Sequence, residues 1–502
     1  MKRIVSIILT LAMLLGMVSV SSFAMAEGSD LEPVTIDWYV MEVPQTGNQA
    51  VWDALNAYLE EKINTHVNFH YYDSTEYATR VGPVLSTPQT ADMIINANSK
   101  LSYVNNVQQG NFVALEDLLP VYAPKTWEMI PEGFWEAMKV DGHIYGIPSY
   151  KDSAQMNSLL INKTLADEIG LDLSNVVINN YLDDVVPLLY EAYEKNNGEF
   201  YVSREFPDQD QWFPCETING LAIVNVPGIE SYKGKGAGEI VFNKYATDEY
   251  RVMCNTIAKM VADGILPEGV WNFDTGRAYT TEGRYFSYGI GSGYLSVAKN
   301  TYSEDWDYDM IPYATFFTTT NYIHNAVNCI SVNSEHPDRV LRLLELVNTD
   351  PYVATTLRFG TEGDYWTMTD EKGVASFEGT LNENKDANYY WYGAQFGALT
   401  SVSIVPVGNP ADYIAKLIEG NDRAITDTNI GFIFDPTPVQ NEIAACNSKI
   451  GEFEVNLKFG FIPLDEVDET IDRFLAELEA SGAQKIIDEA QAQLDAWRAE
   501  HK

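Results

Sequence analysis

The sequence predicts an α/β protein made of two lobes that exchange strands. Strand and helix patterns alternate with short links near the N-terminus, which is typical of a mainly parallel sheet. The chain has 502 residues, of which 46% are hydrophobic, so it can bury two or more compact units. No linker is long enough to separate independent domains, and a strand–helix pattern returns after residue 320. Two interleaved lobes satisfy these observations better than domains in series.

The first 26 residues predict a secretory signal peptide. Lys2 and Arg3 precede an uninterrupted apolar run, and Ala24-Met25-Ala26 supplies a cleavage site. An uncleaved membrane anchor is the alternative, because the run is only slightly shorter than the ~20 residues of a membrane span. No cysteine occurs before Cys215, so the lipid-accepting cysteine of a lipoprotein is absent. We expect an exported, periplasmic or extracellular chain that is soluble and carries no lipid anchor.

The elements that follow build the predicted sheet. "VTIDWYV" is typical of a buried strand, and "THVNFHYY" and "ADMIINA" predict two more strands. Between the first two, Val51, Leu55, Tyr58, Leu59 and Ile63 fall on one face of a helix. "NAVNCISVNSEHPDRVLRLLELVN" predicts a later strand and helix, and three helical patterns end the chain. The last of these places Ile486, Ile487, Ala490, Leu494 and Trp497 on its buried face.

Charge and composition exclude several classes of partner. The formal charge of −40 becomes −42 once Lys2 and Arg3 are removed, which argues against nucleic acid and anionic lipid. The hydrophobic content and 12% aromatic residues exclude a disordered chain. Cys215, Cys254, Cys329 and Cys446 have no CxxC spacing, which argues against a zinc site. Export permits disulfides, but the sequence does not choose among the possible pairings.

Enzyme and metal motifs are missing from the sequence. There is no Walker loop, GxSxG, HExxH or dinucleotide-binding glycine turn. His66 and His70 share one face of a strand, but two histidines alone make a poor metal site. A glycosidase needs two carboxylates at a set separation, and 72 acidic residues make such pairs uninformative. We therefore expect no enzymatic activity, no cofactor and no metal.

Aromatic and amide side chains gather instead at predicted strand ends, where open α/β sheets bind ligands. Flat rings and neutral amides suit a sugar, whose C–H face stacks while its hydroxyls form hydrogen bonds. The run "YYWYG" at 389–393 is too aromatic for one buried face, so we expect Trp391 to face a ligand. For each residue alone, a core or solvated role is the alternative. The candidate ligand-binding residues are Trp38, Gln45, Asn96, Asn98, Ser99, Tyr150, Lys151, Tyr288, Tyr294 and Trp391.

These stretches together resemble family-1 extracellular solute-binding proteins of bacterial ABC importers. "DGHIYGIPSY" followed by "LLINKTLADEIGL" is similar to the first crossing between lobes in that family, and "CISVNSEHPDRVLRLLELVN" to the second. "LRFGTEGDYW" and the tail from "GFIFDPTPVQ" resemble a lipoprotein-like subgroup with a C-terminal domain of uncharacterised function. The similarity covers nearly all of the chain after the signal peptide. The missing lipidated cysteine departs from many members and leaves open how the protein is retained.

The resemblance implies a two-lobed periplasmic-binding-protein type II fold with interlobe hinge strands and C-terminal helices. The expected divisions are a signal peptide (1–26), lobe 1 (27–150), lobe 2 (151–322), a lobe 1 return (323–426) and a C-terminal helical region (427–502). The implied function is an extracytoplasmic receptor, a monomer that binds a solute in the interlobe cleft and delivers it to membrane permease subunits. The family favours an oligosaccharide; a uronic acid, a phosphate or a peptide stays open. A secreted glycan-active hydrolase and a surface adhesin or scaffold are the alternative functions.

Overall fold

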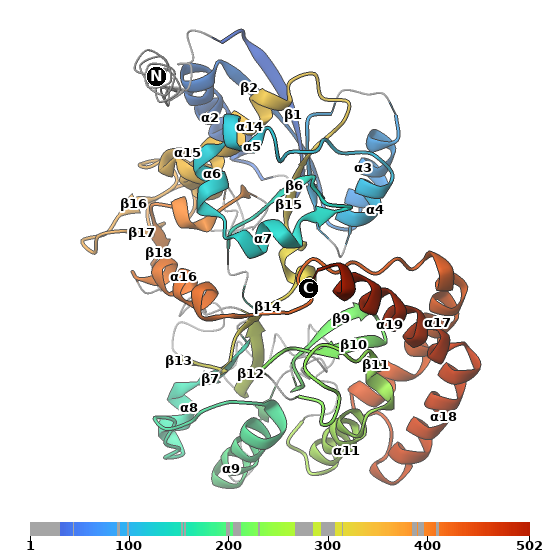
Figure 1. The fold of residues 1–502 in the computed structure, drawn as a ribbon. Coiled ribbons are helices and arrows are strands. Elements are labelled where there is room, and N and C mark those ends of the chain that lie inside the picture. The colour runs from blue at the N-terminus through green and yellow to red at the C-terminus, as the bar shows by residue number, and fades with distance from the viewer. Residues whose placement is uncertain are drawn as a thin grey trace, which may run out of the picture.

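The structure is a computed structural model that describes most of the chain from residue 31 to residue 501. The residues left out within that span are 44, 88–90, 98–99, 152–153, 155–156, 197–200, 204–211, 229–230, 267–284, 293–306, 314, 384–388, 390–395 and 408–410. Figure 1 shows two lobes, one above the other, with the C-terminus at the junction between them. The predicted signal peptide lies outside the described residues. Within the described part, no helix is long and apolar enough to cross a membrane.

The first lobe is built on a five-stranded sheet in the order β2-β1-β3-β15-β6. β1 pairs in parallel with β2 and β3, and β15 runs antiparallel to both β3 and β6. The predicted mainly parallel start of the fold is therefore confirmed, with β15 as the strand that returns late in the chain. The strands are β1 (Val34–Met41), β2 (Thr65–Tyr72), β3 (Met93–Asn96), β6 (Gly146–Pro148) and β15 (Val327–Ile330).

Helices cover this sheet and bury their apolar faces against it. In α2 (Asn48–Ile63), Val51, Leu55, Leu59 and Ile63 are buried as their spacing predicts. In α14 (Pro337–Thr349), Val340, Leu343, Leu344 and Val347 are buried in the same way. The other helices of this lobe are α3 (Tyr77–Leu85), α4 (Tyr103–Gln108), α5 (Leu119–Tyr122), α6 (Pro124–Met129), α7 (Glu132–Ala137), α15 (Pro351–Phe359) and α16 (Tyr413–Arg423). Short strands complete it: β4 (Lys139–Val140), β5 (His143–Ile144), β16 (Thr367–Met368), β17 (Val374–Ser376) and β18 (Val405–Pro406).

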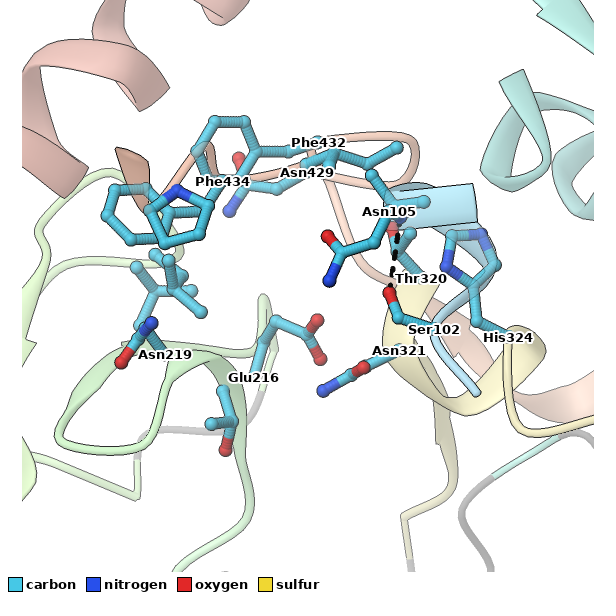
Figure 2. Close-up of a pocket in the computed structure, with 16 residues that line it drawn as sticks. Ser102, Asn105, Glu216, Asn219, Thr320, Asn321, His324, Asn429, Phe432 and Phe434 are labelled. Atoms are coloured by element: carbon cyan, nitrogen blue, oxygen red, sulfur yellow. Dashed lines mark hydrogen bonds between the residues drawn. The ribbon is translucent and has the colours of Figure 1, made fainter. Parts of the chain in front are cut away.

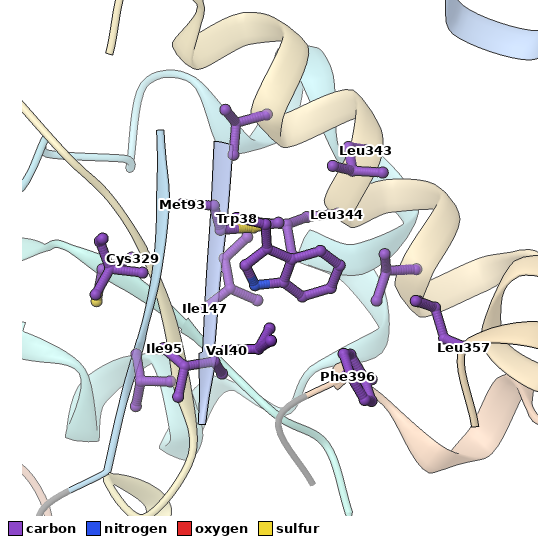
Figure 3. Packing of buried hydrophobic residues seen from close by; sticks show 14 of the residues in the cluster. Trp38, Val40, Met93, Ile95, Ile147, Cys329, Leu343, Leu344, Leu357 and Phe396 are labelled. Atoms are coloured by element: carbon purple, nitrogen blue, oxygen red, sulfur yellow. The ribbon is translucent and has the colours of Figure 1, made fainter. Parts of the chain in front are cut away.

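The core of the first lobe lies between β1 and the helices α14 and α15. Figure 3 shows Trp38 of β1 between Leu344 of α14 and Phe396, with Met93 nearby. The Trp38 ring lies 5.4 Å from the Phe69 ring and 5.6 Å from the Phe396 ring, centroid to centroid. Phe396 follows the aromatic run at 389–393, so the end of that segment is tied into the core.

The second lobe contains two smaller sheets. One has the order β13-β7-β12-β8 and the other the order β11-β10-β9. Their strands are β7 (Asn157–Asn162), β8 (Tyr201–Ser203), β9 (Cys215–Asn219), β10 (Ala222–Asn225), β11 (Phe242–Asn243), β12 (Tyr285–Ser292) and β13 (Tyr308–Pro312). The helical segments between them are α8 (Lys163–Glu168), the π-helical turn η2 (Tyr181–Val185), α9 (Val186–Asn196), the 3-10 turn η3 (Lys244–Ala246) and α11 (Asp248–Ala262).

The C-terminal helices pack into the core of the second lobe. Ile486, Ile487, Ala490 and Leu494 are buried there, as the spacing of the last helix predicts, together with Phe474. This region is therefore not a separate body beside the lobes, although the exact division at residue 427 stays a prediction. The elements are the 3-10 turn η6 (Thr437–Val439), α17 (Gln440–Lys458), the 3-10 turn η7 (Leu464–Glu466), α18 (Val467–Ala480) and α19 (Ala483–Glu500).

The chain passes between the two cores three times. It leaves the first core after Tyr150, returns to it between Tyr313 and Ile323, and leaves it again after Ile404 for the C-terminal helices. The second crossing lies just before Asn328, near the position that the resemblance implies; the third was not predicted. At the junction, β14 (Phe317–Thr318) and β19 (Ile425–Thr426) pair in parallel, followed by α13 (Thr320–Ile323).

Candidate functional site

A pocket of about 400 Å³ opens between the lobes. Its volume lies in the usual range for small-molecule sites. Figure 2 shows α4 and α13 on one side, the strand β9 of the second lobe below, and the segment after β19 above. The side chains that line it are largely amides, hydroxyls and aromatic rings: Ser102, Asn105, Glu216, Thr217, Asn219, Thr320, Asn321, His324, Asn429, Phe432 and Phe434, with Val104, Ile218, Val224, Ile433 and Pro436.

Helix caps fix the two first-lobe edges of the pocket. Ser102 caps α4, and its Oγ accepts a hydrogen bond from Asn105 N over 3.3 Å. Thr319 caps α13 in the same way by accepting from Tyr322 N over 3.3 Å. Gly431 N then donates to Thr320 Oγ1 over 2.8 Å, which ties the segment after β19 to α13. The backbone around Ser102 and Thr320 is therefore fixed at the pocket.

Two carboxyl groups at the junction have raised pKa values. Burial, followed by the nearby Asp427 charge, raises the pKa of Glu216 to about 8. Burial likewise raises the pKa of Asp427 to about 6, although Asn429 N donates to its Oδ1 and Arg498 lowers the pKa. Within the described part of the protein, Asp427 Oδ2 is buried without a hydrogen-bond partner. Near neutral pH, Glu216 therefore carries a proton and can donate a hydrogen bond into the pocket.

His324 is a neutral structural residue at the pocket edge. Its ring is buried, and Nε2 donates to the Ala137 carbonyl over 2.7 Å. Burial lowers the pKa of His324 to about 4, since the charged form would lose its hydration. Among the described residues, no group of three or more His, Cys, Asp or Glu side chains is arranged to hold a metal ion.

Two residues predicted to bind ligand are core residues instead. Trp38 and Asn96 have no exposed surface, so neither side chain can reach a ligand. Both lie on strands near the centre of the first sheet. Helices cover both faces of this sheet, so side chains on either face are buried even at the ends of the strands. The Asn96 side chain contacts the buried Cys329 thiol on the neighbouring strand. The assignment of these two residues to the ligand site was wrong.

The other predicted residues fall beside the pocket or outside the described residues. Tyr150 is buried with its ring against Phe134, and the Lys151 ammonium lies 5.3 Å from the centre of the Tyr322 ring on α13. Gln45 is half-buried, and its carbonyl accepts from Asn48 N at the start of α2. None of these three lines the pocket. Asn98, Ser99, Tyr294, Trp391 and the side chain of Tyr288 lie outside the described residues.

The pocket residues themselves were missed by the sequence analysis. "CETIN" at 215–219 and "NIGFIF" at 429–434 carry the expected amides and rings, but neither follows a strand of the main sheet. The second of these stretches had been assigned to the C-terminal helical region. A search for aromatic residues beside asparagine throughout the chain, rather than at strand ends, would have found it.

Comparison with solved structures identifies the fold. The N-glycan transport solute binding protein NgtS from Streptococcus pneumoniae superposes with a TM-score of 0.78 at 20% identity, covering 94% of this chain and 100% of that one. The fold is that of a two-lobed solute-binding protein. The TM-score falls to 0.67 for the same S. pneumoniae protein in complex with Man5GlcNAc, again at 20% identity and over 94% and 100% of the two chains.

Sequence comparison agrees with the fold. A carbohydrate ABC transporter substrate-binding protein from Streptococcus pneumoniae serotype 4 (strain ATCC BAA-334 / TIGR4) is 23% identical over 483 residues, or 94% of this chain and 92% of the relative. Residues 428–499 match the family described as a domain of unknown function (DUF3502). The sequence-based resemblance to carbohydrate importer receptors with an uncharacterised C-terminal domain is confirmed. These relatives of the solute-binding fold are binding proteins of transporters, not enzymes.

Proposed function

We propose that this protein is the extracytoplasmic receptor of a carbohydrate ABC importer. It binds an oligosaccharide between its lobes and delivers it to membrane permease subunits, acting as a monomer. The observation that carries the proposal is the interlobe pocket, to which both lobes and a connecting segment contribute amides and rings. The named functions of its relatives support the same class of ligand.

The chemistry of the pocket favours a neutral sugar. Its described lining contains no lysine or arginine, and its one carboxyl group, Glu216, carries a proton near neutral pH. Amides and a protonated carboxyl can donate to and accept from hydroxyl groups, while Phe432 and Phe434 offer apolar faces for sugar C–H groups. An anionic sugar would find no compensating positive charge there, and the whole chain is strongly acidic.

Closure of the lobes is the proposed mechanism. A ligand that contacts α4 and α13 on one side and β9 on the other makes its full set of contacts only when the lobes approach each other. It therefore shifts the population toward the closed state. No covalent bond is made or broken, and the connections at β14 and β19 bend.

A thermal-shift screen against neutral and acidic oligosaccharides tests the ligand class. A ligand at ~100 Kd adds roughly 2.7 kcal/mol to the stability of the folded state, so a hit raises the melting temperature clearly. Small-angle scattering with the hit should give a smaller radius of gyration. Product formation from the same panel would point to a hydrolase, and no saturable binding to any sugar would point to an adhesin or scaffold.

A matched pair of amide variants locates the site. Asn219→Ala removes a pocket-lining amide and should weaken sugar binding roughly 2- to 10-fold, the equivalent of one hydrogen bond. Asn175→Ala removes an exposed amide elsewhere on the second lobe, whose Nδ2 donates to Ser174 Oγ, and should leave affinity unchanged. Equal affinities for both variants in titration calorimetry would place the sugar outside this pocket.

A further inference from the structure

The third connection between the lobes forms one wall of the pocket. We call residues 427–436 the linker. Asn429, Phe432 and Phe434 are linker residues that line the pocket. The start of the linker follows β19 and is fixed to the second crossing, because Asp427 N donates to Thr318 O over 3.0 Å. The position of the linker therefore decides where these three side chains lie.

The first half of the linker packs on the first lobe. Gly431 has φ of 91°, in the left-handed region that favours glycine. A Cβ at this position would lie 3.0 Å from the Glu136 carbonyl oxygen of α7, so the chain approaches α7 closely here. Together with the bond from Gly431 N to Thr320 Oγ1, this fixes the linker to α7 and α13.

Residues on both sides of Gly431 are held by or beside α19 (Ala483–Glu500), the last helix of the C-terminal domain. Arg498 Nη1 donates to Asn429 Oδ1 over 2.7 Å, and Asn429 Nδ2 donates to Gly238 O over 2.9 Å. Gln493 bonds the backbone of Asp435 twice: Oε1 accepts from Asp435 N over 2.8 Å and Nε2 donates to Asp435 O over 2.9 Å. The ring of Trp497 lies edge-on to Phe432 with 5.9 Å between centroids.

The hydrogen bonds of Arg498 go to neutral oxygens: Nη1 donates to the linker amide of Asn429 over 2.7 Å and to Gly238 O over 3.3 Å. Its charge also lowers the pKa of Asp427 in the linker, and the carboxylate of Glu239 lies 4.0 Å away. The guanidinium is only about a fifth exposed, with a side-chain exposure of 22%. A residue serving only as a surface ion pair would not lie in this position. Gln493, which lies earlier on α19, bonds the backbone of the linker near its other end, at Asp435.

We infer that the C-terminal domain of unknown function is a brace that fixes the linker against the second lobe and so positions Asn429, Phe432 and Phe434 in the pocket. Arg498 and Gln493 are the positioning residues. The effect on ligand binding rests on the proposed function, whereas the bracing itself does not. The first-lobe contacts of Gly431 then lie between the two contacts with the brace, at Asn429 and Asp435, and α17 and α18 anchor the brace in the second core.

The test compares Arg498→Ala with Arg473→Ala. Arg473 lies on α18 of the same domain, is exposed, and stacks over Phe453 at 5.3 Å, remote from the linker. Hydrogen exchange of peptides covering 427–436 should speed up in Arg498→Ala and stay at the wild-type rate in Arg473→Ala. Affinity for the sugar selected by the thermal-shift screen should fall about tenfold in Arg498→Ala only, the equivalent of about 1.4 kcal/mol.

A double variant separates positioning from general stability. If Arg498 acts through Asn429, adding Arg498→Ala to Asn429→Ala should change affinity little further. If both arginine variants leave linker exchange and affinity unchanged and lower only the melting temperature, the brace is refuted and the domain merely packs on the second core. If the wild-type protein binds no sugar at all, the proposed function fails, while the exchange data still decide on the brace.

Discussion

Tyr389, the first ring of the aromatic run, and Asn382 are joined by reciprocal hydrogen bonds. Tyr389 N donates to Asn382 Oδ1 over 2.9 Å, and Asn382 Nδ2 donates back to the Tyr389 carbonyl. Both side chains are fully buried, and Tyr389 Oη donates to Leu357 O over 3.0 Å. After the run, the buried Arg358 donates to the carbonyls of Phe396 and Gly397. The first ring of "YYWYG" is thus a core ring, and both ends of the segment are anchored in the first lobe.

Replacing Tyr389 should therefore affect stability. Tyr389→Ala removes a fully buried ring and should destabilise the first lobe by about 3–5 kcal/mol, as for other large-to-small aromatic changes. Tyr389→Phe keeps the ring and loses the hydroxyl, which donates to Leu357 O and also bonds the Trp52 side chain, so a loss of about 1–2 kcal/mol is expected. Urea unfolding followed by fluorescence measures both values. Equal, small losses in the two variants would mean that the ring packs poorly.

Trp391 should behave in the opposite way. It lies outside the described residues, between the two anchors, and its contact with a ligand stays a prediction. Trp391→Ala should remove a stacking contact worth about 1–3 kcal/mol, or roughly a 5- to 150-fold loss of affinity. The melting temperature without ligand should barely change if the ring is exposed until the ligand binds. Tyr392→Ala is the control, expected to lower stability more than affinity; unfolding by Trp391→Ala with intact sugar binding would place the indole in the core.

The half-buried Glu216 should make stability depend on pH. Because the pKa of Glu216 is raised to about 8 from its ordinary value of 4.5, the folded state keeps a proton that the unfolded state releases between these values. Its contribution is fully present below pH ~4.5 and is lost as the pH rises through ~8. Asp427 acts in the same direction, up to about pH 6.

Glu216→Gln should flatten this dependence. The amide mimics the protonated acid, so the variant should lose less of its melting temperature between pH 5 and pH 8.5 than the wild type. Glu194→Gln removes an exposed carboxyl of α9 and controls for the change in net charge. Parallel curves for all three proteins would mean that Glu216 ionises freely in the folded state. The effect of His324 on the pH dependence of stability has the opposite sign. Because its pKa is lowered in the folded state, stability is lost as the pH falls below about 6.5.

The cysteines should behave as four thiols. Cys215, Cys254, Cys329 and Cys446 are all buried and unpaired with one another. Burial raises the pKa of Cys254 to about 12 and that of Cys329 well above its usual range, so little reactive thiolate forms. A thiol reagent should label none of them in the folded protein and all of them in guanidinium. A mass gain on reduction would reveal a disulfide instead.

The periodic elements of the first lobe were predictable because one physical condition decides them. A helix on a sheet buries one face, so the spacing of Val51, Leu55 and Leu59 identified α2. Tyr58 shares that spacing but lies at the edge of the face, half-buried, where its hydroxyl donates to Asp350 over 2.8 Å. Whether a residue at the edge of the buried face is covered depends on the neighbouring helix. The periodic pattern of one helix holds no information about that neighbour.

The pocket could not be predicted because its wall comes from stretches far apart in the chain. Ser102, Glu216, Asn321 and Asn429 meet only after the chain has crossed between the lobes three times. The rule that ligands lie at strand ends selected Trp38 and Asn96, whose strands are covered on both faces by helices added later in the sequence. The missed crossing is also the one that carries the linker, so the error in topology and the error in the site have the same origin.

The interleaving of the two cores also orders the assembly of the protein during synthesis. The first core needs residues up to Ile404, and the second needs residues up to Leu494 of the last helix. Chains emerge from the N-terminus onward, and compact units form as soon as their parts are present. Neither lobe can complete its hydrophobic core early in synthesis. The second core is complete only when nearly the whole chain has emerged. A chain cut short before α19 would therefore expose its second core to proteases.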